Sequence, residues 1–119
     1  MFSIELKPNL MLITVSGFIK QGEAMEFMAA YNNKLEEINP LQTNLILDGK
    51  GLKASAQEML PMLEACLKMY IRDNFKKIIL VELESTISMM QLKKLGEATG
   101  FMDNVAVVST VEEGLKQLI

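Results

Sequence analysis

The N-terminal part of the chain alternates between apolar and polar side chains. In residues 2–7 every second side chain is apolar, and strict alternation predicts a β-strand with one buried face. Pro8 and Asn9 are typical turn residues, and residues 10–16 are rich in β-branched side chains, which predicts a second strand. The pattern therefore predicts an N-terminal β-hairpin.

After the hairpin, apolar residues at helical spacing alternate with short, fully apolar runs. The apolar runs predict buried strands, which lie at residues 45–48, 76–84 and 105–108. The helical spacing predicts helices, which lie at residues 22–38, 55–74 and 86–99 and after Thr110. Either Ser85 or Thr86 is expected to cap the third helix and Gly100 to end it, and Thr110 is expected to cap the last. The apolar side chains of each helix are expected to face inward: Ala24, Phe27, Met28, Tyr31, Leu35 and Ile38 in the first, Leu63, Cys66, Leu67 and Tyr70 in the second, Ile87, Met90, Leu92, Leu95 and Ala98 in the third, and Leu115 and Leu118 in the last. Strands and helices that alternate in this way indicate a mixed, mainly parallel sheet with crossover helices. We therefore expect one α/β domain over residues 1–119, with an N-terminal β-hairpin and four helices.

The start of the second helix allows two interpretations. Ser55 and Glu58 have the spacing of a capping box, in which each side chain accepts a hydrogen bond from a free backbone N–H. Pro61 suits a first helical turn but not a helix interior. Either a short turn precedes a helix that begins at Pro61, or one helix carries a kink.

Composition excludes several classes of function. The chain has 12 basic and 15 acidic residues, a net charge of −3 and no basic cluster, which argues against binding to nucleic acid. No leader segment is evident, and no apolar run approaches the roughly 18 residues that span a bilayer, so we expect no membrane association. The single cysteine, Cys66, is unable to form an internal disulfide, which suits a reducing cytoplasm.

Several local sequences, taken in order, resemble the STAS domain family, which includes anti-sigma-factor antagonists. The similar segments are V-S-G-F-I at 15–19, L-I-L-D at 45–48 followed by Gly51 and Leu52, L-G-E-A-T-G-F at 95–101 and T-V-E-E-G-L at 110–115. The resemblance implies a STAS-like fold and a non-catalytic regulatory module without a cofactor. It also implies a protein partner, such as a regulatory kinase or an anti-sigma-like protein.

The chain departs from this family at the phosphorylation motif. Antagonists of the family carry Asp-Ser-Ser/Thr-Gly at the start of the second helix, where a serine is phosphorylated. The motif aligns with residues 54–57, which read A-S-A-Q, so only Ser55 matches. A phosphate on Ser55 would meet free N–H groups and the positive end of a helix dipole. The pairing of Ser55 with Glu58 instead favours a simpler role, in which Ser55 is only a helix cap.

The predicted partner surface is the loop after the third strand together with one side of the second helix. It comprises Gly49, Lys50, Gly51, Lys53, Ser55, Met62 and Met69. Met62, Met69 and Met89 fall beside the apolar stripes of their helices, whereas Met90 fits a core position. Exposed methionine makes an adaptable contact surface. The alternative is that the second helix is buried on two sides and these methionines only widen the core. The partner at this surface could also be a second copy of the chain, which would give a homodimer. The alternative function is binding of a small apolar ligand in a pocket beneath the second helix.

An enzymatic function has weaker support in the sequence. Asp48, Glu82 and Glu84 follow or end predicted strands, and carboxylates on one rim are able to bind a divalent cation or to act as an acid and base. The chain has no histidine and no recognisable nucleophile, and Cys66 falls on the inner stripe of a helix. We therefore interpret the carboxylates as solvated strand ends and expect no catalysis and no bound metal.

Overall fold

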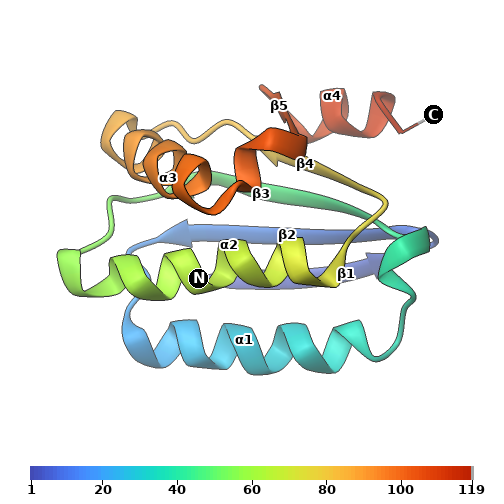
Figure 1. The fold of residues 1–119 in the computed structure, drawn as a ribbon, viewed down its shortest axis with the longest axis horizontal. Helices are drawn as coiled ribbons and strands as arrows, with labels where there is room; N and C mark the ends of the chain where they lie inside the picture. Colours follow the sequence, from blue (N-terminus) through green and yellow to red (C-terminus); the bar gives the residue numbers. More distant parts are fainter. Residues whose placement is uncertain (119) are drawn as a thin grey trace.

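A five-stranded sheet forms the centre of the structure, a computed structural model that describes residues 1–118 (Figure 1). The strands are β1 (Phe2–Lys7), β2 (Leu10–Gly17), β3 (Asn44–Leu52), β4 (Lys77–Val81) and β5 (Val105–Val108). They lie side by side in chain order. β1 and β2 pair antiparallel as a hairpin, and every later neighbour is parallel. The predicted mixed α/β sheet is confirmed.

Helices cover the two faces of the sheet unequally. The helices are α1 (Gln21–Leu35), α2 (Leu60–Asp73), α3 (Thr86–Thr99) and α4 (Val111–Lys116). Because the parallel strands follow one another without reversal, right-handed crossovers place α1, α2 and α3 on the same face, where they share one large core. The short α4 packs on the opposite face, with Gly114 against Ile79 and Ile46. Three helices thus enclose one side of the sheet, and the candidate site lies there.

The predicted turn and cap residues occupy the expected positions. Asn9 has φ 62° in the hairpin turn, a conformation that asparagine tolerates better than most residues. Ser85 caps α3 by accepting a hydrogen bond from the Ser88 N–H at 3.2 Å, and Thr110 caps α4 in the same way. These side chains satisfy N–H groups that a helix end otherwise leaves free.

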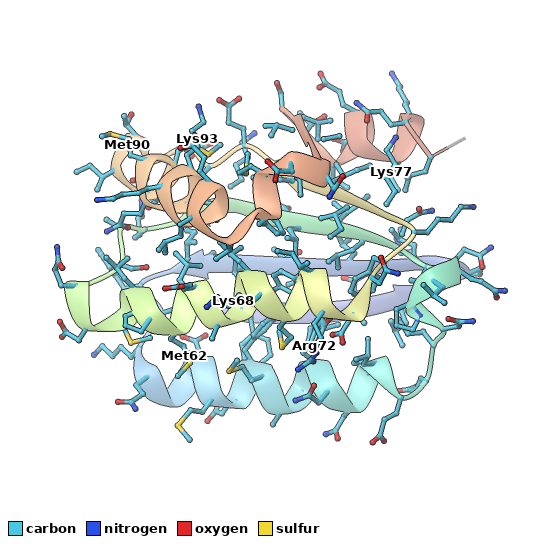
Figure 2. All side chains as sticks on the ribbon, in the orientation of Figure 1. Met62, Lys68, Arg72, Lys77, Met90 and Lys93 are labelled. Carbon is cyan, nitrogen blue, oxygen red and sulfur yellow. The ribbon has the colours of Figure 1, made fainter. Side chains whose placement is uncertain are left out.

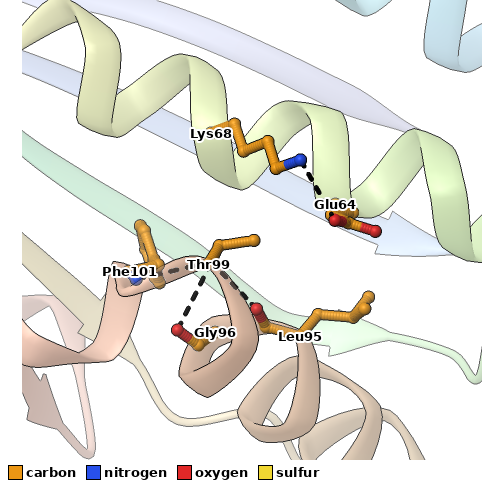
Figure 3. A network of polar contacts seen from close by, with 6 residues as sticks. All are labelled: Glu64, Lys68, Leu95, Gly96, Thr99 and Phe101. Atoms are coloured by element: carbon orange, nitrogen blue, oxygen red, sulfur yellow. Dashed lines mark hydrogen bonds and ion pairs between the residues drawn. The ribbon is translucent and has the colours of Figure 1, made fainter.

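The C-terminal end of α3 is fixed against α2. Thr99 Oγ1 donates to the Leu95 carbonyl at 2.8 Å and accepts from the Phe101 N–H at 3.4 Å (Figure 3). Gly100 follows with φ 81°, a left-handed conformation that favours glycine at a helix end. The turn directs Phe101 into the core, where its ring lies 6.2 Å from the ring of Tyr70.

The predicted apolar stripe of α3 was correct for Leu92, which is buried, but wrong for two other members. Ile87 and Met90, expected inward, are 62% and 65% exposed. The residues of α3 that are buried are Ser88, Met89, Leu92 and Gly96. Small residues allow a helix to approach its neighbours closely, and an argument from hydrophobicity alone does not assign them to the core. Leu115 of α4, also expected inward, is likewise exposed.

Within residues 1–118 no helix combines the length and the apolar character that crossing a bilayer demands.

Candidate functional site

An apolar cavity of about 120 Å³ lies between the sheet and the helices α1 and α2. This space is partly open to solvent and is therefore a pocket, not a sealed void. It is lined by Ile13, Val15, Leu47, Gly49, Leu80 and Leu83 on the sheet side, and by Ala24, Phe27, Leu63, Cys66, Leu67, Tyr70 and Leu92 on the helix side. Its remaining lining residues are Phe2, Ile19, Glu23, Leu52, Ser55, Met59 and Met62.

Small side chains on facing elements account for the empty volume. Ala24 on α1 and Cys66 on α2 both line the cavity, where larger apolar residues would fill it. In addition, α2 begins only at Leu60, so irregular chain and a single 3₁₀ turn cover the sheet before it. The cavity therefore follows from residue size and from the late start of α2.

We call residues 53–59 the strap, because this segment connects β3 to α2 and contributes Ser55 and Met59 to the cavity lining. Helix α3 holds the strap through the Gln91 side chain. The Ser55 N–H donates to Gln91 Oε1 at 2.9 Å, and Gln91 Nε2 donates to the Ser55 carbonyl at 2.9 Å. One turn earlier, the Ser88 hydroxyl donates to the Leu52 carbonyl at 3.1 Å. Polar contacts from α3 thus fix this edge of the cavity.

Few polar groups reach the cavity. Glu23 forms an ion pair with the Met1 ammonium group at 2.8 Å, and no lysine or arginine is among the lining residues. Burial raises the pKa of the Cys66 thiol to about 11, so this thiol is neutral at physiological pH and is a poor nucleophile. An anion bound here would have no cationic partner, which favours uncharged ligands.

The two buried tyrosines of the core differ in their hydrogen bonding. The Tyr31 hydroxyl donates to Asp73 Oδ2 at 2.8 Å and so joins α1 to α2. Tyr70 is only 6% exposed and lines the cavity. Burial raises the pKa of the Tyr70 hydroxyl well above its usual value, so the group remains a neutral donor.

The predicted partner loop has a different structure from the one expected. Residues 49–52 continue β3 and do not form a loop. Gly49 is buried and lies so close to Leu83 that an added Cβ would be 3.3 Å from its Cδ1. An added Cβ on Gly51 would similarly lie 3.1 Å from the Ser16 Cβ. These glycines permit close packing within the sheet, and only Lys50, Gly51 and Lys53 of this segment are exposed.

The predicted capping box at Ser55 was wrong. The first turn after β3 is a 3₁₀ turn, Gln57–Met59, which has Ala56 as its N-cap and no side-chain cap. The α-helix then begins at Leu60 with Pro61 in its first turn, which agrees with the first of the two interpretations except that Ser55 caps nothing. Ser55 therefore stays a predicted phospho-acceptor in the strap, without the helix N-terminus that supported the prediction.

The methionine surface also needs correction. Met69, predicted to lie at a partner surface, is 5% exposed and belongs to the core. Met62 is half-buried and lines the cavity on the side of α2 that faces α1 (Figure 2). Met90 instead projects from α3, away from α2. The two methionines predicted to make a partner surface are thus involved in the core and the cavity.

The rim carboxylates do not form a metal site. Glu82 and Glu84 are exposed, while Asp48 Oδ1 accepts a local hydrogen bond from the Lys50 N–H at 3.2 Å. Among the residues that the structure describes, no group of three or more carboxylate, thiol or imidazole side chains is placed to hold a metal ion. The apolar cavity is therefore the candidate site.

Sequence reasoning named a pocket beneath the second helix but not the residues that make it. Ala24 and Tyr70 were assigned to the core, and Gly49 was assigned to a loop. A signal was present in the small residues at inward positions, Ala24 and Cys66, but hydrophobic spacing alone does not show which small residues face each other.

No protein-family profile matches this sequence, and a search of curated proteins finds no significant match.

Proposed function

We propose that this domain is a non-catalytic binding module that takes up a small, neutral, apolar molecule in the cavity beneath α2. The observation that carries the proposal is the cavity itself, with its volume of about 120 Å³ and almost wholly apolar lining. Apolar cavities of about 150 Å³ in other proteins stay dry and bind benzene. The expected ligand is therefore a compact hydrocarbon-like molecule about the size of a six-membered ring.

Charge narrows the class of ligand further. The only carboxylate in the lining, Glu23, is already paired with the Met1 ammonium group. A carboxylate or phosphate on the ligand would lose its hydration without gaining a cationic partner, which is costly in an apolar site. Neutral compounds are therefore favoured over fatty-acid-like or phosphorylated ones.

Binding without turnover agrees with the chemistry of the lining. The Cys66 thiol is neutral because burial raises its pKa to about 11, and nucleophilic catalysis relies on an activated group. An unpaired thiol also suits a reducing compartment, and the proposal includes a cytoplasmic location.

A titration followed by ¹⁵N–¹H correlation spectra tests this function. Toluene is expected to shift the amide signals of cavity-lining residues, such as Val15 and Leu63. Sodium benzoate, which has the same ring and a negative charge, is expected to leave these signals unchanged. The proposal fails when toluene at its solubility limit shifts no lining residue, or when benzoate produces the same shifts.

A second candidate is the regulatory protein-interaction module that the STAS resemblance implies. It is favoured by Ile87 and Met90, which lie one turn apart on α3 and are mostly exposed. Adjacent apolar side chains on a helix surface are suited to contact a partner or a second copy of the chain. This surface replaces the one predicted around Met69.

Sedimentation velocity tests the dimeric form of this second candidate. Met90→Glu is expected to abolish concentration-dependent self-association, because it replaces one of the two exposed apolar side chains with a charged one. Met25→Glu, at another exposed methionine on α1, serves as the matched control and is expected to have no effect. A wild-type chain that remains monomeric at high concentration rules the dimer out.

A further inference from the structure

Among residues 1–118 the Tyr70 hydroxyl has no hydrogen-bond partner. Every side-chain oxygen and nitrogen in residues 1–118 that is completely shielded has a hydrogen-bond partner. Tyr70 is almost completely buried, yet its hydroxyl takes part in none of the hydrogen bonds that the described residues form. Its oxygen therefore retains some accessible surface, and we expect that surface to face the cavity, because Tyr70 is one of the residues that line it.

The direction of the side chain supports this placement. Long side chains on an α-helix point back toward its N-terminus and lie over the preceding turn. For Tyr70 the residue one turn earlier is Cys66, which lines the same cavity. The ring is held between Tyr31 and Phe101, at centroid distances of 5.6 Å and 6.2 Å, so packing fixes its orientation.

A neutral phenol in an apolar cavity acts as a hydrogen-bond donor. A ligand without an acceptor would leave this donor unpaired, whereas a ligand with a carbonyl or ether oxygen would satisfy it. We propose that the ligand of the cavity is a neutral, compact molecule with one oxygen acceptor, of the ketone, lactone or cyclic ether class, and that Tyr70 donates a hydrogen bond to that oxygen. This inference rests on the proposed binding function and specifies its ligand.

Two probes of the same shape test the inference. Cyclohexanone and methylenecyclohexane differ only in that a carbonyl oxygen replaces a methylene group. Their affinities for the wild-type chain and for Tyr70→Phe are measured by ¹⁵N–¹H correlation spectra. Tyr70→Phe keeps the aromatic ring and removes only the donor.

We expect Tyr70→Phe to weaken cyclohexanone binding by about three- to tenfold, the usual net value of one hydrogen bond, and to leave methylenecyclohexane binding unchanged. Equal effects on the two probes, or no effect on either, overturn the assignment of Tyr70 while the binding function stands. If neither cyclohexanone nor methylenecyclohexane binds to the wild-type chain, the binding function is overturned as well.

A measurement without ligand checks the premise independently. Tyr31→Phe removes a hydroxyl that is bonded to Asp73 and is expected to lower Tm. Tyr70→Phe removes an unpartnered hydroxyl, so Tm is expected to stay the same or rise. A decrease in Tm for Tyr70→Phe as large as that for Tyr31→Phe shows that the Tyr70 hydroxyl has a protein partner, which overturns the inference.

Discussion

Among the glycines, Gly96 is the one at which an added methyl group has the least room. A Cβ added there would lie 2.5 Å from Met102 Cγ and 3.7 Å from Phe101 Cδ2. The first distance is far below a normal contact, so Met102 would be forced to move. Because Met102 lies in the 3₁₀ turn Phe101–Asn104 that follows α3, a shift there also disturbs the position of Phe101.

We expect Gly96→Ala to lower the free energy of unfolding by about 1–3 kcal/mol, the usual cost of overpacking. Gly22→Ala on α1 is the matched control, since no atom lies within 4 Å of its added Cβ. It is expected to be neutral or to stabilise by up to about 1 kcal/mol through helix propensity. Urea unfolding measures both values, and a Gly96→Ala chain as stable as Gly22→Ala contradicts the packing argument.

Glycine and methionine are the residues that sequence reasoning assigned least well. Gly49 and Gly51 suggested a loop by their identity, but they lie within β3, where neighbouring side chains leave no room for a Cβ. Met69 and Met90 were each assigned to the wrong environment. Methionine is compatible with both environments, so its exposure depends on the exact phase of the helix, which the surrounding sequence defines only loosely.

At the scale of elements, α3 acts on the strap through two residues one turn apart. Ser88 binds the Leu52 carbonyl and Gln91 binds both backbone groups of Ser55. The Gln91 side-chain amide accepts from the N–H of Ser55 and donates to its carbonyl. It thus forms the pair of hydrogen bonds that a neighbouring β-strand would otherwise form with that residue. The strap is therefore held by polar contacts as well as by the apolar side chains of the cavity.

Replacing Gln91 with leucine removes both hydrogen bonds to Ser55 and keeps a side chain of similar size. We expect the Ser55 amide to exchange with deuterium at least about tenfold faster, since two bonds of roughly 1 kcal/mol each are lost. Lys93→Leu, at an exposed position on the same helix, is the control. Unchanged exchange at residues 53–59 in Gln91→Leu means that apolar packing alone holds the strap.

Element boundaries were predictable only where local chemistry determines them. Ser85, Gly100 and Thr110 mark helix ends that the structure confirms, because a cap depends on a few adjacent residues. The start of α2 was less predictable. Ser55 and Glu58 have the spacing of a capping box, yet the Ser55 backbone pairs with Gln91, which lies 36 residues away in the sequence. A contact at that separation leaves no local signal.

At the scale of the whole molecule, the fold was predictable because the hydrophobic pattern, the turn residues and the order of the elements all indicate the same architecture. The alternation of strands with helices determines the parallel sheet, and the consecutive strand order places α1, α2 and α3 on one face. The cavity was not predictable in the same way. It depends on small residues from two elements, Ala24 and Cys66, which come together only after the chain has folded.

The cavity also makes a prediction about global stability, since filling it adds apolar contacts that the native chain lacks. Cys66→Leu enlarges a lining residue and is expected to raise the free energy of unfolding by roughly 1–2 kcal/mol, at about 0.8 kcal/mol for each buried methylene-sized group. Val81→Leu enlarges a residue that is fully buried in the separate core beneath α4. It is expected to destabilise by about 1–3 kcal/mol, the usual cost of adding a methylene group to a buried, packed position.

The same two variants connect stability to binding. A ligand that binds only the native state raises Tm in proportion to the logarithm of its concentration. Toluene is therefore expected to raise Tm in the wild type and in Val81→Leu but not in Cys66→Leu, whose leucine occupies the space. Should Cys66→Leu be destabilised as strongly as Val81→Leu, and still respond to toluene, the space beside Cys66 is not the site where the ligand binds.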